Sequence, residues 1–139
     1  MGLYVLDTDI LSLFQMGHAI VRQRVAEHAA ADLTVTIITV EEQLSGWYTL
    51  RRRIKDRAQL ARVYERFAAN VRFLSRVQIL SFPESAIERY EQLVRAKLGV
   101  RSNDLRIAAI ALDRSAVVVT RNRGDFQRVA GLQVEDWSV

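Results

Sequence analysis

The stretch LYVLDTDIL (residues 3–11) decides the fold class. Residues 3–6 form an apolar run that predicts a strand, and Asp7-Thr8-Asp9 ends the run in a turn. A second run of this kind, AVVV at 116–119, ends at Thr120. Short, nearly continuous apolar runs are typical of parallel strands that helices cover on both faces. The two stretches therefore indicate an α/β protein.

Predicted strands and helices alternate along the rest of the chain. Further strands are expected at 33–38, 77–82 and 132–134. Apolar residues at helical spacing predict helices at 10–15, 19–30, 39–53, 57–74, 83–98 and 102–114. Gly17 should separate the first two helices, Pro83 should lie in the first turn of the fifth, and Gly99 should end it. This alternation predicts a mostly parallel central sheet between two helical layers.

Length and composition favour one packed domain over residues 1–139. Half of the residues are apolar, 26% are charged, and no linker or repeat is visible. The absence of cysteine excludes a disulfide framework, a thiolate metal site and a cysteine nucleophile. No apolar run approaches the ~20 residues that span a bilayer, and residues 1–11 do not resemble a signal peptide. We therefore expect a cytoplasmic protein that does not enter membranes.

Positive charge is concentrated in one segment. The chain carries a formal charge of +4, but residues 51–76 contain nine basic and two acidic residues, a net charge of +7. A basic segment beside a more acidic body suits a polyanionic partner. On charge alone, a solvated helical face explains the segment at least as well.

Carboxylates follow the ends of several predicted strands, which is where open α/β sheets bind ligands, and Asp104 opens the helix that leads into the strand at 116–119. These side chains, with their polar neighbours, are Asp7, Asp9, Glu41, Glu42, Asp104, Thr120, Asn122 and Asp125. Carboxylates that share a cleft stay ionised together only beside a cation, and without it at least one pKa should rise. Hard oxygen ligands without histidine or cysteine favour Mg²⁺ or Mn²⁺ over Zn²⁺. His18 and His28 lie in the first helical region, outside this set.

Each acid also has a purely structural explanation. Asp7 or Asp9 can cap the helix that begins near residue 10. Thr39 and Glu42 fit a capping box. Asp104 can complement a helix dipole behind a Ser102 cap, and Asp125 can hold the turn at 123–124. Four acidic positions at one predicted sheet edge are harder to explain by such local roles.

The chain resembles PIN-domain ribonucleases of the VapC toxin kind from Leu3 to Trp137. LYVLDTDIL resembles the opening motif of the family, in which the acid that closes the strand is Asp7. TIITVEEQLSGW resembles the second motif and selects Glu42 over Glu41, while NDLRIAAIAL resembles the third and gives Asp104. VVVTRNRGDFQRVAGLQVEDW resembles the C-terminal block.

The resemblance implies a three-layer α/β/α PIN-like fold and a metal-dependent endoribonuclease. It implies a toxin–antitoxin system in which the partners are an RNA substrate, a cognate antitoxin protein and a second copy of the chain. Mg²⁺, with Mn²⁺ as an alternative, would be held by Asp7, Glu42 and Asp104, with Asp9 and Thr120 in support. Many family members place a fourth acid where this chain has Asn122, so either Asp125 supplies that charge or Asn122 acts as a neutral hydrogen-bonding group.

Parts of the sequence also fit three other functions. Asp7-Thr8-Asp9 and Thr120 also resemble motifs of haloacid-dehalogenase-type phosphatases, but no lysine follows Thr120 in the remaining 19 residues. A receiver module needs an aspartate after the third strand, where residues 81–85 read SFPES. A catalytically impaired PIN-like module that binds RNA or protein remains the alternative, and Asn122 is the feature that supports it.

Two surfaces are expected to bind partners. Candidate RNA contacts are Arg52, Arg53, Lys55, Arg121 and Arg123. Successive residues of a helix point about 100° apart, so only one or two of Arg51, Arg52 and Arg53 should face the same RNA. An association surface is expected on the helical segment 40–74, which carries Trp47, Tyr48, Tyr64 and Phe67.

Overall fold

The computed structural model describes residues 2–139. The strands are β1 (Tyr4–Leu6), β2 (Leu33–Thr36), β3 (Gln78–Leu80), β4 (Val117–Val119) and β5 (Val134–Glu135). The helices are α1 (Thr8–Gln15), α2 (Ala19–Ala26), α3 (Ile37–Arg53), α4 (Arg57–Leu74), α5 (Glu84–Arg95), α6 (Ser102–Asp113) and α7 (Arg123–Phe126), with a 3-10 turn at Ala30–Asp32. No helix within 2–139 is both long and apolar enough to cross a bilayer.

The strands form one parallel sheet in the order β3-β2-β1-β4-β5. Leu6 of β1 pairs with Val119 of β4, so these two strands end at the same level. From β1 the chain adds β2 and β3 on one side, and it then returns to place β4 and β5 on the other. The strand order therefore reverses between β1 and β4, and such a reversal opens a crevice at the carboxyl ends of the strands.

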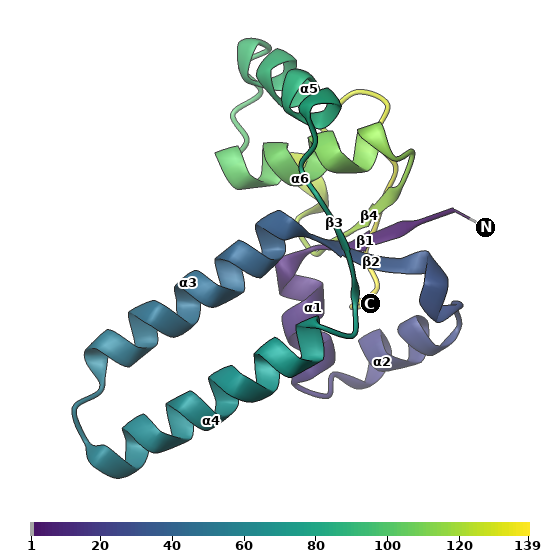
Figure 1. Cartoon of the computed structure of the whole chain (residues 1–139). Coiled ribbons are helices and arrows are strands. Elements are labelled where there is room, and N and C mark those ends of the chain that lie inside the picture. The colour runs from purple at the N-terminus through teal and green to yellow at the C-terminus, as the bar shows by residue number, and fades with distance from the viewer. Residues whose placement is uncertain (1) are drawn as a thin grey trace.

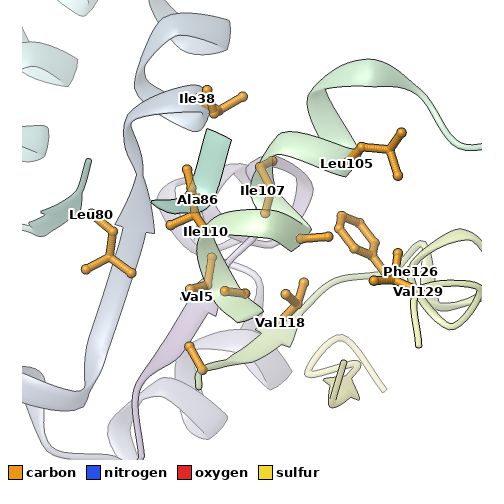
Figure 2. Packing of buried hydrophobic residues seen from close by; sticks show 13 residues of the cluster. Val5, Ile38, Leu80, Ala86, Leu105, Ile107, Ile110, Val118, Phe126 and Val129 are labelled. Carbon is orange, nitrogen blue, oxygen red and sulfur yellow. The ribbon is translucent and has the colours of Figure 1, made fainter. Parts of the chain in front are cut away.

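Two apolar clusters on opposite faces of the sheet confirm the predicted three-layer α/β/α architecture. Side chains alternate between the faces of a strand, so Val5 and Val118 point into one cluster while Leu6 and Val119 point into the other. Helices α5 and α6 cover the first face, and α1 and α2 cover the second (Figure 1). Figure 2 shows the first cluster, in which Phe126 and Val129 pack beside the α6 residues. The central strands β1 and β4 are largely buried on both faces, as the runs at 3–6 and 116–119 predicted.

Helices α3 and α4 form an antiparallel hairpin that extends away from the sheet (Figure 1). Trp47 and Phe67 stack on each other inside it, with ring centroids 5.9 Å apart. Tyr48 and Tyr64 remain 46% and 48% exposed. Tyr48 also packs edge-on against Phe67, with ring centroids 5.7 Å apart, so three of the four aromatic residues expected on an association surface help to hold the hairpin together.

The second strand is shorter than expected, and this changes how the next helix begins. β2 ends at Thr36, and Ile37 and Ile38 already belong to α3. Thr36 is the N-cap, and its hydroxyl oxygen accepts a hydrogen bond from the Thr39 amide at 3.3 Å. The predicted capping box of Thr39 and Glu42 is therefore wrong. The β-branched run suits either a strand or a buried first turn, and the cap decided between them.

Other boundaries differ where short-range patterns were ambiguous. α2 ends at Ala26, and α5 ends at Arg95 because Lys97, rather than Gly99, is the first residue to take a positive φ, at 52°. The N-cap of α6 is Arg101, without a side-chain cap, instead of Ser102. The last strand begins at Val134, two residues later than predicted. The short helix α7 was not predicted, since four residues carry too little periodicity.

Candidate active site

A cleft of about 370 Å³ lies at the carboxyl edge of the sheet, where the strand order reverses. Each of its walls comes from a segment that follows a strand or opens a helix. The residues that line it are Asp7, Thr8, Asp9, Ser12, Glu42, Arg101, Asp104 and Asn122. The fold therefore brings Asp7, Glu42 and Asp104 to one place, together with Asp9 and Asn122.

Asp7 ends β1 and caps α1. One carboxylate oxygen accepts from the Thr8 amide and the other from the Thr120 hydroxyl, both at 2.8 Å. Burial of this side chain raises the pKa of the Asp7 carboxyl to about 7, the charge of Asp9 adds to the rise, and the two hydrogen bonds oppose it. The expected upward shift is thus present, but desolvation contributes more to it than neighbouring charge.

Glu42 lies in the second turn of α3 and is oriented by two neighbouring side chains. Thr8 donates its hydroxyl proton to Oε1 of Glu42 at 2.7 Å, and Asn103 donates an amide proton to Oε2 at 3.4 Å. Glu41 is exposed and lines the neighbouring groove instead of this cleft. The geometry therefore agrees with the choice of Glu42 over Glu41.

Asp104 lies in the first turn of α6 and is only 2% exposed. Arg101 donates two hydrogen bonds to Asp104, from Nη2 to Oδ1 at 3.1 Å and from Nε to Oδ2 at 3.4 Å. The same Nη2 lies 4.0 Å from Oε2 of Glu42. These carboxylates raise the pKa of the Arg101 guanidinium, the contact with Asp104 most of all. A guanidinium thus supplies the positive charge in the acidic cleft.

Asn122 and Asp125 are the two candidates for the fourth metal-binding position. Asn122 lines the cleft, and its amide donates to Oδ2 of Asp104 at 3.4 Å and to Oδ2 of Asp125 at 3.0 Å. Asp125 does not line the cleft, and it also lies 3.7 Å from Arg128. Asp125 therefore reaches the acidic group through Asn122 instead of facing it directly.

Asp9 joins the first helix to the loop after β4. Its Oδ1 accepts from the Ile10 amide at 2.7 Å, and its Oδ2 accepts from the Arg121 amide at 3.1 Å. Burial raises the pKa of the Asp9 carboxyl. Both oxygens are engaged by backbone donors, which fits the supporting position expected for Asp9.

The carboxylate oxygens of the cleft are suitable ligands for a hard divalent cation, but the side chains are not arranged closely enough to coordinate one. Carboxylate oxygens are the ligands that Mg²⁺ and Mn²⁺ prefer. Within residues 2–139, however, no three His, Cys, Asp or Glu side chains are grouped closely enough to hold a metal ion. His18 caps α2 and His28 stacks on Trp137, and neither lines the cleft.

A larger groove of about 1290 Å³ continues from the cleft along α3. Glu42 and Asn103 line its end next to the cleft, and Arg53 and Arg106 also line it. Arg52 and Lys55 are exposed but do not line this groove, while the exposed Arg121 and Arg123 lie between β4 and α7 and at the first residue of α7, respectively. The candidate RNA contacts therefore fall into two groups, one near the cleft and one at the far end of α3.

Sequence reasoning missed Thr8, Asn103 and Arg101. Thr8 and Asn103 stand next to predicted acids, and adjacency was the available signal. Arg101 stands three residues before Asp104, a spacing that brings side chains together on a helix. Nothing local, however, indicates that it also approaches Glu42, which is 59 residues away.

Comparison with known proteins places this geometry in a family. The PIN domain family matches residues 4–132. Ribonuclease VapC1 of Haemophilus influenzae is 29% identical over 143 residues, which cover 98% of each chain. The VapBC-1 structure from nontypeable Haemophilus influenzae superposes with a TM-score of 0.73 at 30% identity, covering 99% of each chain. A DNA-bound VapBC structure from Salmonella typhimurium gives 0.77 at 28% identity, also covering 99% of each.

The match spans strands β1 to β4, both helical layers and every residue that lines the acidic cleft. It agrees with the four sequence blocks and with the observed parallel α/β/α architecture. The chain belongs to the PIN-domain family and is similar to the VapC ribonucleases within it.

Proposed function

We propose that this protein is a divalent-metal-dependent endoribonuclease, the toxin of a VapBC-type toxin–antitoxin pair. The observation that carries the proposal is the convergence of Asp7, Glu42 and Asp104 in one cleft, from three segments far apart in the chain. Two of these carboxylates are almost fully buried, at 6% and 2% exposure, and a buried carboxylate is costly unless its charge is compensated. The similarity to Ribonuclease VapC1 supports RNA as the substrate.

Asp7, Glu42 and Asp104 would hold Mg²⁺ or Mn²⁺, with Asn122 in the fourth position and Asp125 orienting its amide. A divalent ion held there would supply activation of a water molecule and stabilisation of the charge that develops on the scissile phosphate. Thr120 and the Thr8 amide fix both oxygens of Asp7, while the Thr8 hydroxyl and Asn103 orient Glu42. No side chain has to act as a nucleophile.

Positive charge beside the cleft would bring the RNA backbone to these acids. Arg121 and Arg123 are exposed next to Asn122, and they are the candidates for contact near the scissile phosphate. Arg53 lines the groove that leads away from Glu42 and would hold the strand further along. An acidic cleft alone repels a polyanion, so such a basic border is needed for binding.

Cleavage of a fluorophore-quencher RNA oligonucleotide by the purified chain tests the activity. We expect cleavage that needs Mg²⁺ or Mn²⁺ and stops with EDTA, and at least a ~100-fold loss of rate for Asp104→Asn. Asp113→Asn is the matched control, because Asp113 pairs with Arg89 and Ser85 outside the cleft. If Asp104→Asn cleaves as fast as the unmodified chain, the assigned site is wrong.

An antitoxin protein is the second partner that we propose, because the structural relatives are VapBC complexes. Expression of the chain alone should arrest growth, and co-expression of the neighbouring open reading frame should relieve the arrest. The Asp104→Asn variant should not arrest growth at all. Arrest by that variant would separate toxicity from the cleft.

A catalytically impaired PIN-like module is the alternative. Two observations favour it: Asn122 occupies an acidic position of the family, and no ready-made metal group exists within 2–139. A metal-binding enzyme should melt at a higher temperature in millimolar Mn²⁺, and Asp7→Asn should abolish that rise. Absence of a rise in the unmodified chain would favour the binding module.

A further inference from the structure

We propose that Arg101 is a built-in competitor for the divalent cation, so that a metal ion enters the cleft only when this guanidinium leaves. The inference rests on the proposed function, because it needs a metal ion to be bound by Glu42 and Asp104. It concerns a residue that the sequence motifs did not include.

The position of Arg101 carries the inference. Its two contacts with Asp104, at 3.1 and 3.4 Å, form a fork that uses both oxygens of that carboxylate. Its Nη2 also approaches Oε2 of Glu42, at 4.0 Å. The guanidinium is therefore the cation shared by the two acids that a metal ion would have to share.

The two cations exclude each other by distance and by charge. A divalent ion with carboxylate ligands lies about 2.1 Å from each ligand oxygen. An ion bound to Asp104 and Glu42 would come within a few ångströms of Arg101 as it now stands, and like charges at that separation repel each other. The hydrogen bonds of Arg101 also occupy both oxygens of Asp104.

Arg101 can leave at low cost, whereas Asp104 cannot. The Arg101 side chain is 71% exposed, so its charge can turn into solvent with little rearrangement. Asp104 is 2% exposed and stays in place on α6. In the absence of metal, Arg101 compensates the charge of a buried carboxylate that would otherwise be isolated. Metal binding replaces one compensating cation with another.

The consequence is a weaker apparent affinity for metal than the carboxylates alone would give. If the competent state is populated for a fraction of the time, the apparent dissociation constant rises by the inverse of that fraction. Removal of the Arg101 side chain should therefore tighten metal binding while it destabilises the metal-free protein. If Arg101 had a merely structural role, its removal would lower both the affinity for metal and the stability of the metal-free protein.

The test is isothermal titration of the full chain with Mn²⁺, together with metal-free melting temperatures. We expect Arg101→Ala to bind Mn²⁺ at least ~10-fold more tightly than the unmodified chain and to melt at a lower temperature in EDTA. Arg101→Lys keeps the charge but loses the fork, so its affinity should lie between the two. If Arg101→Ala does not fold, Arg101→Gln serves in its place.

Arg121→Ala is the matched control for charge. Arg121 also lies beside the cleft, where burial raises the pKa of Asp9 and the charge of Arg121 partly offsets that rise, but no hydrogen bond or ion pair within 2–139 joins its side chain to Glu42 or Asp104. We expect this variant to change the affinity less than ~3-fold. If both alanine variants gained the same affinity for Mn²⁺, the gain would come from the loss of positive charge in general, and the proposal would be overturned.

The outcomes also separate this proposal from the proposed function. If the unmodified chain binds Mn²⁺ and cleaves RNA, but Arg101→Ala binds the ion no more tightly, only the competition is overturned. If neither the unmodified chain nor Arg101→Ala binds Mn²⁺ at millimolar concentration, the metal site fails and both proposals fall with it.

Discussion

At the residue scale, Asp7 combines a cap, a strand end and a buried charge. Its carboxylate accepts hydrogen bonds from Thr8 and Thr120, yet burial still raises its pKa to about 7. The fold therefore tolerates this group more easily when it is protonated. Such a cost is typical of a residue kept for chemistry instead of stability.

The raised pKa of Asp7 predicts how stability depends on pH in the metal-free protein. Between about pH 4 and pH 7 the folded chain keeps a proton that the unfolded chain has lost, so the free energy of unfolding falls as the pH rises. The loss is complete above pH 7 and amounts to at most about 4 kcal/mol. Urea unfolding in EDTA at pH 5.5 and pH 8 measures it.

Asp7→Asn should remove most of this dependence, because asparagine keeps the cap and cannot ionise. Its largest gain over the unmodified chain is expected at pH 8. The control Asp113→Asn, outside the cleft, should keep the original dependence. An Asp7→Asn profile parallel to that of the unmodified chain would show that Asp7 is ionised throughout this range.

Thr120 provides a second prediction at this scale. The side chain is fully buried. Its hydroxyl donates a hydrogen bond to Asp7 at 2.8 Å and accepts one from the backbone amide of Asn122 at 2.9 Å. Thr120→Val has nearly the same shape but leaves both partners without this bond, so we expect a loss of about 1–3 kcal/mol. The loss should be larger at pH 8, where Asp7 is charged, than at pH 5.5.

The matched variant is Thr49→Val, whose hydroxyl donates to a backbone oxygen on the exposed side of α3. Denaturant unfolding should show a change below about 0.5 kcal/mol for this variant. Equal effects of the two substitutions would mean that the hydroxyl of Thr120 contributes no more than a surface group.

At the scale of elements, α3 links the acidic cleft to the basic segment. Glu42 lies near its start and Arg53 at its end, about 16 Å apart along the helix axis. The groove beside α3 contains both side chains. A single helix can thus place the carboxylate of Glu42 beside the scissile bond and the guanidinium of Arg53 further along the RNA strand.

This arrangement predicts different roles for two consecutive arginines. Arg53 lines the groove, whereas Arg52 points about 100° away from it. Arg53→Ala should weaken binding of a non-cleavable single-stranded RNA and reduce the log–log salt slope by about 0.7. Arg52→Ala should leave both unchanged. Fluorescence anisotropy at several salt concentrations measures the two quantities, and equal effects would move the RNA path away from the groove.

At the scale of the whole molecule, the protruding hairpin of α3 and α4 leaves aromatic surface exposed. Tyr48 and Tyr64 are 46% and 48% exposed, while Trp47 and Phe67 stack within the hairpin. Exposed aromatic side chains are enriched at protein interaction surfaces. We propose that this face joins two copies of the chain.

Sedimentation velocity at micromolar concentration tests this interface. The unmodified chain should sediment with twice the mass of one chain, and Tyr64→Lys should shift it toward the monomer. Ile87→Lys, at a residue that is 38% exposed on α5, should leave the dimer intact. A monomer in the unmodified sample contradicts the homodimer.

The order of elements was predictable from sequence because it depends on local patterns. Apolar runs and helical spacing predicted the first four strands and six helices to within a few residues, and the polar residues at the strand ends and at the start of the sixth predicted helix included Asp7, Glu42 and Asp104. The start of α3 was misplaced because the run at 33–38 suits a strand as well as a buried first turn. The family resemblance added the choice of Glu42 over Glu41.

What only the tertiary structure decided is how these side chains meet. Asn122 faces the cleft and Asp125 stands behind it because the unpredicted helix α7 turns the chain there. Arg101 lies between Asp104 and Glu42 because α3 and α6 pack against each other. A sequence specifies which charges exist and on which element they lie. Their distances depend on the packing of elements far apart in the chain, and those distances determine which charges compensate one another.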